Sequence, residues 1–239
     1  MTWHLVEGIE GCDFAVREGL TAIIVDALRA SATAAMLLHH GATQIRVVRD
    51  VEEALAAKAA DPEALLFGER GGLPPAGFDA GNSPRETAIA CRRRVIFTTT
   101  NGAKCLVAAQ GAPAVIFATT TNASAAARFA LGRGRGAVLI PAGLEGAPKE
   151  AATEDRVSAA YIAHCAGVEL GEGRAISSLY AGQMNPTGLQ EVFAAAPHSA
   201  ALRAIGLDAD IHYCAQPDLT SAVPRVTHYE GRQALIEIA

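Results

Sequence analysis

The sequence predicts an α/β protein built around a largely parallel or mixed β-sheet. Short apolar runs alternate along the chain with alanine-rich amphipathic segments, the pattern of strands joined by helices. Half of the 239 residues are hydrophobic, so the chain can bury a sizeable core. Because no long linker divides the chain, we expect a single domain over residues 1–239, within which a C-terminal subdomain would begin at about residue 199.

The first half of the chain contains a regular alternation of strands and helices. Residues 20–25 form an apolar strand that ends at Asp26, and the helix that follows stops at Gly41. A second helix ends at Asp61 and Pro62, since proline cannot continue it. In order, the predicted elements are strand 20–25, helix 30–41, strand 45–48, helix 51–60 and strand 65–67.

The second half of the chain begins with three more apolar runs and then becomes mainly helical. The runs are short and bounded by polar or glycine-containing segments, as expected of buried strands. The predicted strands are 94–97, 115–117 and 138–140, followed by helices 153–166, 173–181 and 199–205. The segment 210–214 comes next, and two further strands are expected around 225–228 and 234–238.

Two segments of the chain repeat the same short pattern. Residues 95–103 and 115–123 each contain a hydrophobic strand, three threonines, an asparagine and the start of an alanine-rich helix. Threonine and asparagine cap helix N-termini, whose free N–H groups can also hold an anion. We therefore expect two adjacent Thr/Asn loops that bind a ligand, although capping alone would explain either loop.

Charge and cysteine content exclude several classes of function. The net charge is −5 and no Lys/Arg run suits a phosphodiester backbone, so we expect no nucleic-acid partner. No segment approaches the ~18 consecutive apolar residues of a membrane span, so we expect no membrane association. The five cysteines are scattered, without a zinc or disulfide pattern, and no secretory signal is visible. These features predict a cytoplasmic protein.

Polar side chains gather where the predicted strands end. Asp26 and Arg29 follow one strand, and Glu69 and Arg70 follow another. Further strands lead into the polar segments 98–101, 119–122 and 141–143. Ligands of open α/β sheets bind beyond the carboxyl ends of the strands, so we expect these residues to form one binding site.

The residue types in this site suit a metal ion beside an anion. Asp26, Glu69 and Asp79 are hard oxygen donors of the kind that Mg²⁺ prefers. Arg29 and Arg70 can clamp a phosphate or carboxylate with paired hydrogen bonds. The glycine-rich segments 68–72 and 77–86 allow the backbone to approach a ligand closely.

Other familiar catalytic motifs are absent from the sequence. Leu28 stands two residues after Asp26, where an aspartyl phosphatase of the haloacid dehalogenase type carries a second aspartate. Neither a P-loop nor a dinucleotide fingerprint occurs. Glu154 and Asp155 open a helix, where they would serve as acid, base or metal ligand, or only complement the helix dipole. The seven histidines show no ligand spacing, and we interpret them all as structural or surface residues.

These motifs resemble those of the 2-phosphosulfolactate phosphatase family. The resemblance runs in the family's order from about residue 20 to residue 225, and Gly-Glu-Arg followed by Gly-Phe-Asp-Ala-Gly-Asn-Ser-Pro is its most specific part. The matching segments are 24–33, 68–70, 77–84, 99–102, 121–123, 142–143, 154–155, 210–215 and 223–224. The resemblance implies a three-layer α/β/α fold and an Mg²⁺-dependent phosphatase that acts on 2-phospho-3-sulfolactate, in a step toward coenzyme M.

We therefore expect an Mg²⁺-dependent phosphatase for the phosphate monoester of a small anionic 2-hydroxy acid, and a homodimer is a reasonable expectation for such an enzyme. Two alternatives remain open: an Mg²⁺-dependent lyase or isomerase acting on a phosphorylated acid, and a non-catalytic phosphometabolite-binding protein. The expected catalytic residues are Asp26, Arg29, Glu69, Asp79 and Asp155, with Asp26, Glu69 and Asp79 as metal ligands. The expected substrate-binding residues are Arg70, Asn82, Ser83, Thr99, Thr100, Asn101, Gly102, Asn122 and Gly143.

Overall fold

The computed structural model describes residues 2–144, 146–148 and 151–239. Its strands are β1 (Trp3–Leu5), β2 (Thr21–Val25), β3 (Gln44–Val48), β4 (Leu65–Gly68), β5 (Arg94–Thr98), β6 (Val115–Phe117), β7 (Ala137–Pro141), β8 (Pro224–Glu230) and β9 (Gln233–Ile238). Its α-helices are α1 (Gly8–Glu18), α2 (Ala30–His39), α3 (Val51–Ala60), α4 (Gly102–Ala108), α5 (Ala123–Gly132), α6 (Thr153–Ala166), α7 (Arg174–Leu179), α8 (Pro186–Ala195), α9 (Pro197–Ala204) and α10 (Asp208–Cys214). Short 3₁₀ helices are η1 (Pro84–Ala90), η2 (Thr120–Asn122) and η4 (Ala181–Gln183).

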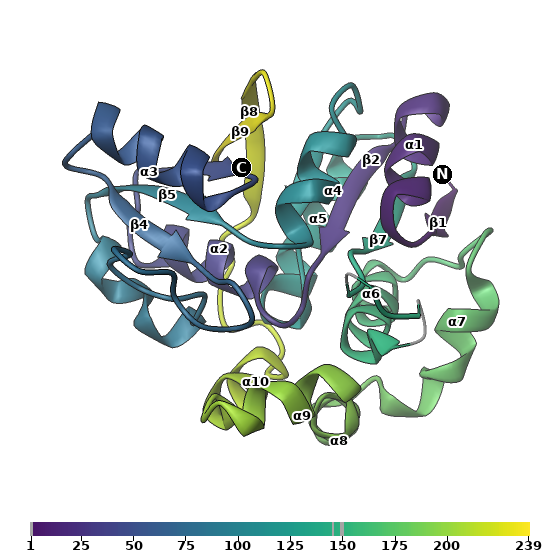
Figure 1. Cartoon of the computed structure of the whole chain (residues 1–239). Coiled ribbons are helices and arrows are strands. Elements are labelled where there is room, and N and C mark those ends of the chain that lie inside the picture. The colour runs from purple at the N-terminus through teal and green to yellow at the C-terminus, as the bar shows by residue number, and fades with distance from the viewer. Residues whose placement is uncertain (1, 145, 149–150) are drawn as a thin grey trace.

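The described residues form one mixed, nine-stranded sheet in the order β1-β7-β2-β6-β8-β9-β3-β5-β4. The block β1-β7-β2-β6 is parallel, and so is the block β3-β5-β4. The β8–β9 hairpin joins the two blocks through three successive antiparallel pairings. The strands of the second block therefore run in the opposite direction to those of the first. In Figure 1 the blocks lie on either side of this hairpin.

Helices cover both faces of the sheet, which gives the three-layer α/β/α arrangement. β2 is buried along its whole length because both of its faces are covered. Successive side chains point to opposite faces, so Ile24 packs in a core with α1, α2 and α4, whereas Ile23 and Val25 pack with α5 and α6. On the second block, α3 covers the face opposite the Ile24 core.

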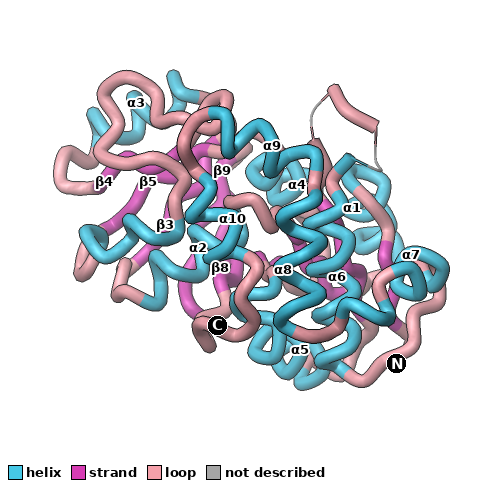
Figure 2. The backbone as a smooth tube through the Cα atoms, turned by 90° about the horizontal axis from the view of Figure 1, so that it is seen from below, coloured by secondary structure: helices cyan, strands magenta, loops and turns pink. Residues whose placement is uncertain are grey.

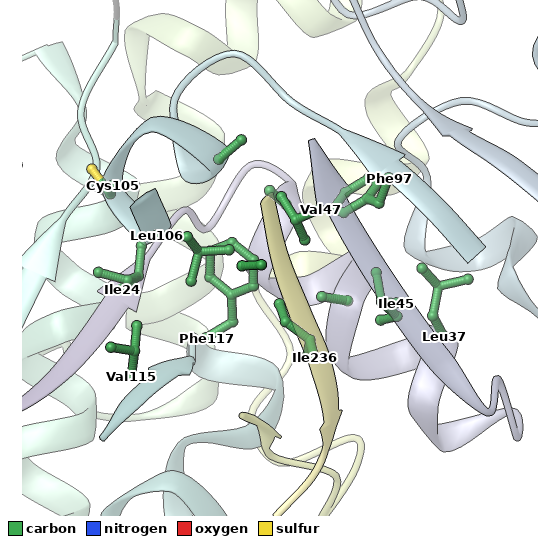
Figure 3. Close-up of a cluster of buried hydrophobic side chains, with 14 of the residues drawn as sticks. Ile24, Leu37, Ile45, Val47, Phe97, Cys105, Leu106, Val115, Phe117 and Ile236 are labelled. Atoms are coloured by element: carbon green, nitrogen blue, oxygen red, sulfur yellow. The ribbon is translucent and has the colours of Figure 1, made fainter. Parts of the chain in front are cut away.

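The β8–β9 hairpin is also packed into the core. Figure 3 shows Ile236 of β9 between Phe117 and Leu106 on one side and Ile45 and Val47 on the other. All five side chains are buried and belong to one hydrophobic cluster. The hairpin therefore joins the blocks by side-chain packing as well as by backbone hydrogen bonds.

The helices near the C-terminus form a separate group beside the sheet. α8 packs on α6 (Figure 2). α10 packs on η1. Their apolar side chains Leu189, Phe193, Leu202 and Ile211 pack against Leu28, which follows β2. This group therefore lies against the loop that follows β2.

The element predictions are largely confirmed, and α6 has the predicted bounds. β1, α1 and α8 were not predicted from the sequence. The α8 helix had a readable signal, because the Asn185 side chain caps the Gly188 N–H and Pro186 occupies the first turn. None of the helices in the described part of the chain is long and apolar enough to cross a lipid bilayer.

Truncation of Ile236 is expected to weaken the whole fold because this side chain is fully buried where the two blocks meet. Ile236→Ala should lower the free energy of unfolding by about 2–4 kcal/mol, through lost burial and the cavity that remains. The measurement is the midpoint of urea unfolding. Ile238→Ala on the same strand is the control, because Ile238 is 61% exposed and should cost less than about 0.5 kcal/mol. Equal losses in both variants would contradict a core role for the hairpin.

Candidate active site

A cavity of about 370 Å³ lies where the loops after β2, β4 and β5 meet α9. One part of its wall is apolar and comes from Leu28, Leu144, Ala201, Leu202 and Ile205. The remainder comes from polar residues and glycines, namely Asp26, Arg29, Glu69, Gly71, Gly72, Asn82, Thr99, Thr100, Asn101 and His198. Many of the residues predicted from the sequence therefore meet in one cavity.

Parallel pairing alone does not explain this convergence. β2 and the β4–β5 pair belong to blocks of opposite sense, so their carboxyl ends do not share one edge of a uniform sheet. The chain after β5 instead runs back to β2. A Cβ atom built on Gly102 would lie 3.0 Å from Asp26 Oδ2 and 3.2 Å from Phe117, so a larger residue at this position would crowd both groups.

Asp26 is held at the junction of β2 and α2. Its Oδ1 atom accepts a hydrogen bond from the Ala30 N–H at 3.1 Å, and its backbone N–H donates to Ser31 Oγ at 2.9 Å. Burial raises the pKa of Asp26 to about 6, and the nearby Glu69 carboxylate adds to the rise. The Ala30 N–H, His198 and the Gly102 N–H oppose it. Asp26 thus carries a charge that the fold only partly stabilises.

Arg29 is fixed in the cavity wall by a buried network. Its Nη1 atom donates to Asp210 Oδ2 at 2.6 Å, and its Nη2 atom donates to the Gly72 carbonyl at 2.7 Å. Ser83 Oγ donates to the other oxygen of Asp210 at 2.8 Å. Both charged side chains are at most 2% exposed. Ser83 therefore acts on the cavity indirectly, through Asp210 and Arg29.

Glu69 also lines the cavity and joins two of its loops. Its Oε1 atom accepts hydrogen bonds from both the N–H (3.2 Å) and the hydroxyl (3.0 Å) of Thr100, and its Oε2 atom accepts from the Gly72 N–H at 3.0 Å. Gly72 has a φ of +85°, and a Cβ atom there would lie 2.6 Å from Ile205 on the neighbouring wall. A glycine is thus required where the β4 loop meets the C-terminal helices.

Asn82 contributes an uncommitted oxygen. The residue is 2% exposed and lines the cavity, and its Oδ1 atom has no hydrogen-bond partner among the described residues. An unpaired polar atom in a buried position costs free energy. The Oδ1 atom of Asn82 is therefore an unsatisfied acceptor beside the cavity.

His198 is a cavity residue that the sequence analysis missed, since all seven histidines were interpreted as structural or surface residues. Its Nδ1 atom lies 3.2 Å from Oε1 of Glu154, a carboxylate that is 1% exposed. The pairing through Nδ1 leaves Nε2 as the other polar atom of the ring. The only local signal is the position of His198 directly after Pro197, in the first turn of α9.

Asp155 lies behind the cavity wall. Its Oδ1 atom accepts from the Ala27 N–H at 2.7 Å and its Oδ2 atom from the Gly143 N–H at 3.0 Å. Burial raises its pKa well above the ordinary value, and the nearby Glu154 and Asp26 add to the rise. Asp155 and Gly143 therefore join the loop after β2 to the loop after β7, and neither lines the cavity.

The structure does not bring Asp79 together with the other predicted metal ligands. Its carboxylate accepts from the Leu66 N–H at 2.7 Å and lies 3.7 Å from Lys58 Nζ. Leu66 is in the interior of β4, whereas Glu69 follows the end of that strand. The sequence spacing could not reveal that the residues between Glu69 and Asp79 turn back along β4.

Arg70 and Asn122 also lie away from the cavity. Arg70 lines a different cleft, with Arg49 and Lys104. Asn122 is fully buried, where it accepts from the Thr119 N–H at 3.0 Å and donates to the Ala222 carbonyl at 3.0 Å. Of the two Thr/Asn loops only the one after β5 faces the cavity, and the one after β6 is a buried structural cap.

The donors present fit a weakly held Mg²⁺ better than a tightly chelated metal. No group of three or more His, Cys, Asp or Glu residues that could hold a metal occurs within the described residues. The cavity lining does include the carboxylates of Asp26 and Glu69 and the amide side chain of Asn82. Mg²⁺ commonly binds one or two carboxylates and keeps several waters, so this donor set is compatible with it.

Comparison with known proteins identifies the family. Residues 7–228 match the family described as 2-phosphosulpholactate phosphatase. A relative from Thermus thermophilus is 39% identical over 211 residues, which cover 84% of this chain and 86% of the relative. A relative from Deinococcus radiodurans is 36% identical over 212 residues, covering 85% and 86%. Both relatives are named probable 2-phosphosulfolactate phosphatases. The chain belongs to the 2-phosphosulfolactate phosphatase family.

Proposed function

We propose that this protein is a phosphoric monoester hydrolase that releases phosphate from 2-phospho-3-sulfolactate with the help of Mg²⁺. Family membership and the names of the relatives support the substrate. The observation that carries the mechanism is the cavity itself. Its lining combines the carboxylates of Asp26 and Glu69 with the amide of Asn82 and the guanidinium of Arg29, and this combination suits a cation and an anionic ester held together.

In this proposal, Asp26 and Glu69 would hold Mg²⁺, with the amide of Asn82 beside them in the cavity lining. A bound Mg²⁺ neutralises charge on the phosphoryl oxygens as a Lewis acid. Arg29 binds an anionic group of the substrate with the N–H groups not engaged by Asp210 and Gly72. Because its guanidinium is fixed before the substrate arrives, little reorganisation is needed on binding.

His198 is the residue best placed to transfer a proton to the leaving group. The hydroxyl of lactate is a poor leaving group, and its developing negative charge favours protonation as the ester bond breaks. Glu154 holds the imidazole in place through Nδ1, and Nε2 is the ring atom that would donate the proton. The apolar wall of Leu28, Leu144, Leu202 and Ile205 limits the access of water to this part of the cavity.

A first experiment separates hydrolysis from the other reactions considered for this site. Incubation with 2-phosphosulfolactate and Mg²⁺ should release inorganic phosphate. EDTA should abolish the release, because without Mg²⁺ the carboxylates of Asp26 and Glu69 repel the anionic substrate. Phosphate and the organic product are measured together. A modified product that keeps its phosphate would indicate a lyase or isomerase, and binding without any turnover would indicate a binding protein. Release that EDTA leaves unchanged would contradict the role of Mg²⁺.

Asp26→Asn is expected to lower kcat/KM at least about 100-fold, as is typical when a directly acting group is lost. Asp79→Asn is the matched control. Its amide oxygen can still accept from the Leu66 N–H, so activity and Mg²⁺ dependence should stay within about twofold of wild type. If Asp79→Asn were as damaging as Asp26→Asn, the assignment of the metal ligands would be wrong.

The same Asp26→Asn variant should be more stable than wild type in metal-free buffer at neutral pH. The pKa of Asp26 is raised from 3.8 to about 6, so its ionised form destabilises the folded state above pH 6. Removal of that charge should add up to about 3 kcal/mol to the free energy of unfolding. The gain should shrink as the pH falls from 6 toward 4, since wild-type Asp26 then becomes protonated. Urea unfolding in EDTA at pH 7.5 and at pH 4.5 measures both values, and a gain independent of pH would contradict this cause.

His198→Gln should lower kcat for 2-phosphosulfolactate about 100-fold because Gln cannot donate a proton to the leaving hydroxyl. An aryl phosphate, whose phenolate leaves without protonation, should lose far less activity in the same variant. His228→Gln, at an exposed position on β8, is the control and should behave as wild type with both substrates. Equal losses with the two substrates would show that His198 only shapes the cavity.

A further inference from the structure

A second cleft, of about 290 Å³, lies next to the active-site cavity. Its residues come from the chain after β3, β4 and β5, from α4 and from the tip of the β8–β9 hairpin. They are Arg49, Asp50, Arg70, Thr100, Lys104 and Arg232. The cleft therefore contains four cationic side chains and one carboxylate, in a protein whose net charge is −5.

Three of these cations have no carboxylate partner among the residues that the structure describes. Within residues 2–144, 146–148 and 151–239, the side chains of Arg49 and Lys104 have no hydrogen-bond or ion-pair partner. The Arg70 guanidinium donates only to neutral oxygens, those of the Glu69 carbonyl (2.6 Å), the Arg49 carbonyl (2.9 Å) and the Thr98 hydroxyl (3.0 Å). Arg232 is the exception, with Asp50 at 3.8 Å and Glu53 at 3.4 Å.

Most arginines elsewhere in the described chain do have an acidic partner. Arg94 pairs with Asp61 at 2.6 Å, Arg156 with Glu7 at 2.6 Å and Arg203 with Asp208 at 2.8 Å. Three positive charges around one cleft repel one another, although solvent screens the exposed Arg49 and Lys104, and an anion between them would remove the repulsion. The three hydrogen bonds of Arg70 also hold its guanidinium in place and leave two of its five N–H donors available.

We propose that this cleft is a second anion site, which binds a free inorganic oxyanion of the phosphate class. Such a tetrahedral dianion can accept hydrogen bonds on several sides at once, which matches a cleft with cations on several walls. Thr100 lines both the cleft and the active-site cavity. Both its N–H and its hydroxyl are engaged by Glu69, so these two residues form the wall between the sites.

The test is a titration of the metal-free protein with inorganic phosphate in EDTA, followed by ¹H–¹⁵N NMR. The probe variant combines Arg49→Gln with Lys104→Gln, which removes two cations outside the proposed catalytic machinery. The control combines Arg133→Gln with Arg135→Gln. It removes the same charge from an exposed loop before the amino end of β7, away from both sites.

Saturable shifts at the amides of Arg49, Arg70, Thr100 and Lys104 are expected in wild type and control, with binding about tenfold weaker in the probe variant. Equal affinity in all three proteins, or shifts confined to the active-site cavity, would overturn the proposal.

Enzyme kinetics show whether the cleft binds a free oxyanion or an acidic group of the bound substrate. KM for 2-phosphosulfolactate should change less than about threefold in the probe variant, because screening weakens charges outside the cavity. A rise in KM about as large as the loss of phosphate affinity would assign the cleft to the substrate instead.

Discussion

The buried ion pair between Arg29 and Asp210 is the interaction on which the site depends. Two charges that are almost fully buried are costly to desolvate, and their pairing is favourable only when the remaining donors and acceptors are also satisfied. Gly72 and Ser83 provide those partners. The network thereby joins the loop after β2, the glycine-rich segment after β4 and α10. Loss of either charge would leave its partner buried and uncompensated and would release all three segments together.

The cavity contains buried polar groups that lower the stability of the folded protein and suit the cavity to a charged ligand. Asp26 and Glu69 face the same space, and burial keeps the pKa of Asp26 high at about 6. Asn82 leaves a buried oxygen without a partner among the described residues. A well-packed core would not retain these features, and each would become favourable on binding of the proposed cation. The strain is localised, since the surrounding loops are held by full sets of hydrogen bonds to Glu69 and Asp155.

The two Thr/Asn loops show how far sequence patterns can predict a site. Their sequences are nearly the same, and both follow strands, but only the loop after β5 lines the cavity. The loop after β6 is covered by the C-terminal chain, where Asn122 binds the Ala222 carbonyl and Thr120 binds the Cys214 carbonyl. The partners that cover it lie about a hundred residues further along the chain. No local pattern could distinguish the two loops, because their difference comes from what packs on them.

The sequence by itself determined the strands, most helices and the polar loops, because hydrophobic periodicity, glycine, proline and capping residues act over a few neighbouring positions. It also determined the family, through motifs such as those around Asp26 and Glu69. Only the tertiary structure decided which polar residues share a cavity. The β8–β9 hairpin reverses one block of strands, Asp79 turns back along β4, Arg70 faces a separate cleft, and α9 brings His198 to the site. These outcomes depend on contacts between segments that are distant in the sequence, and such contacts produce no local pattern in the sequence.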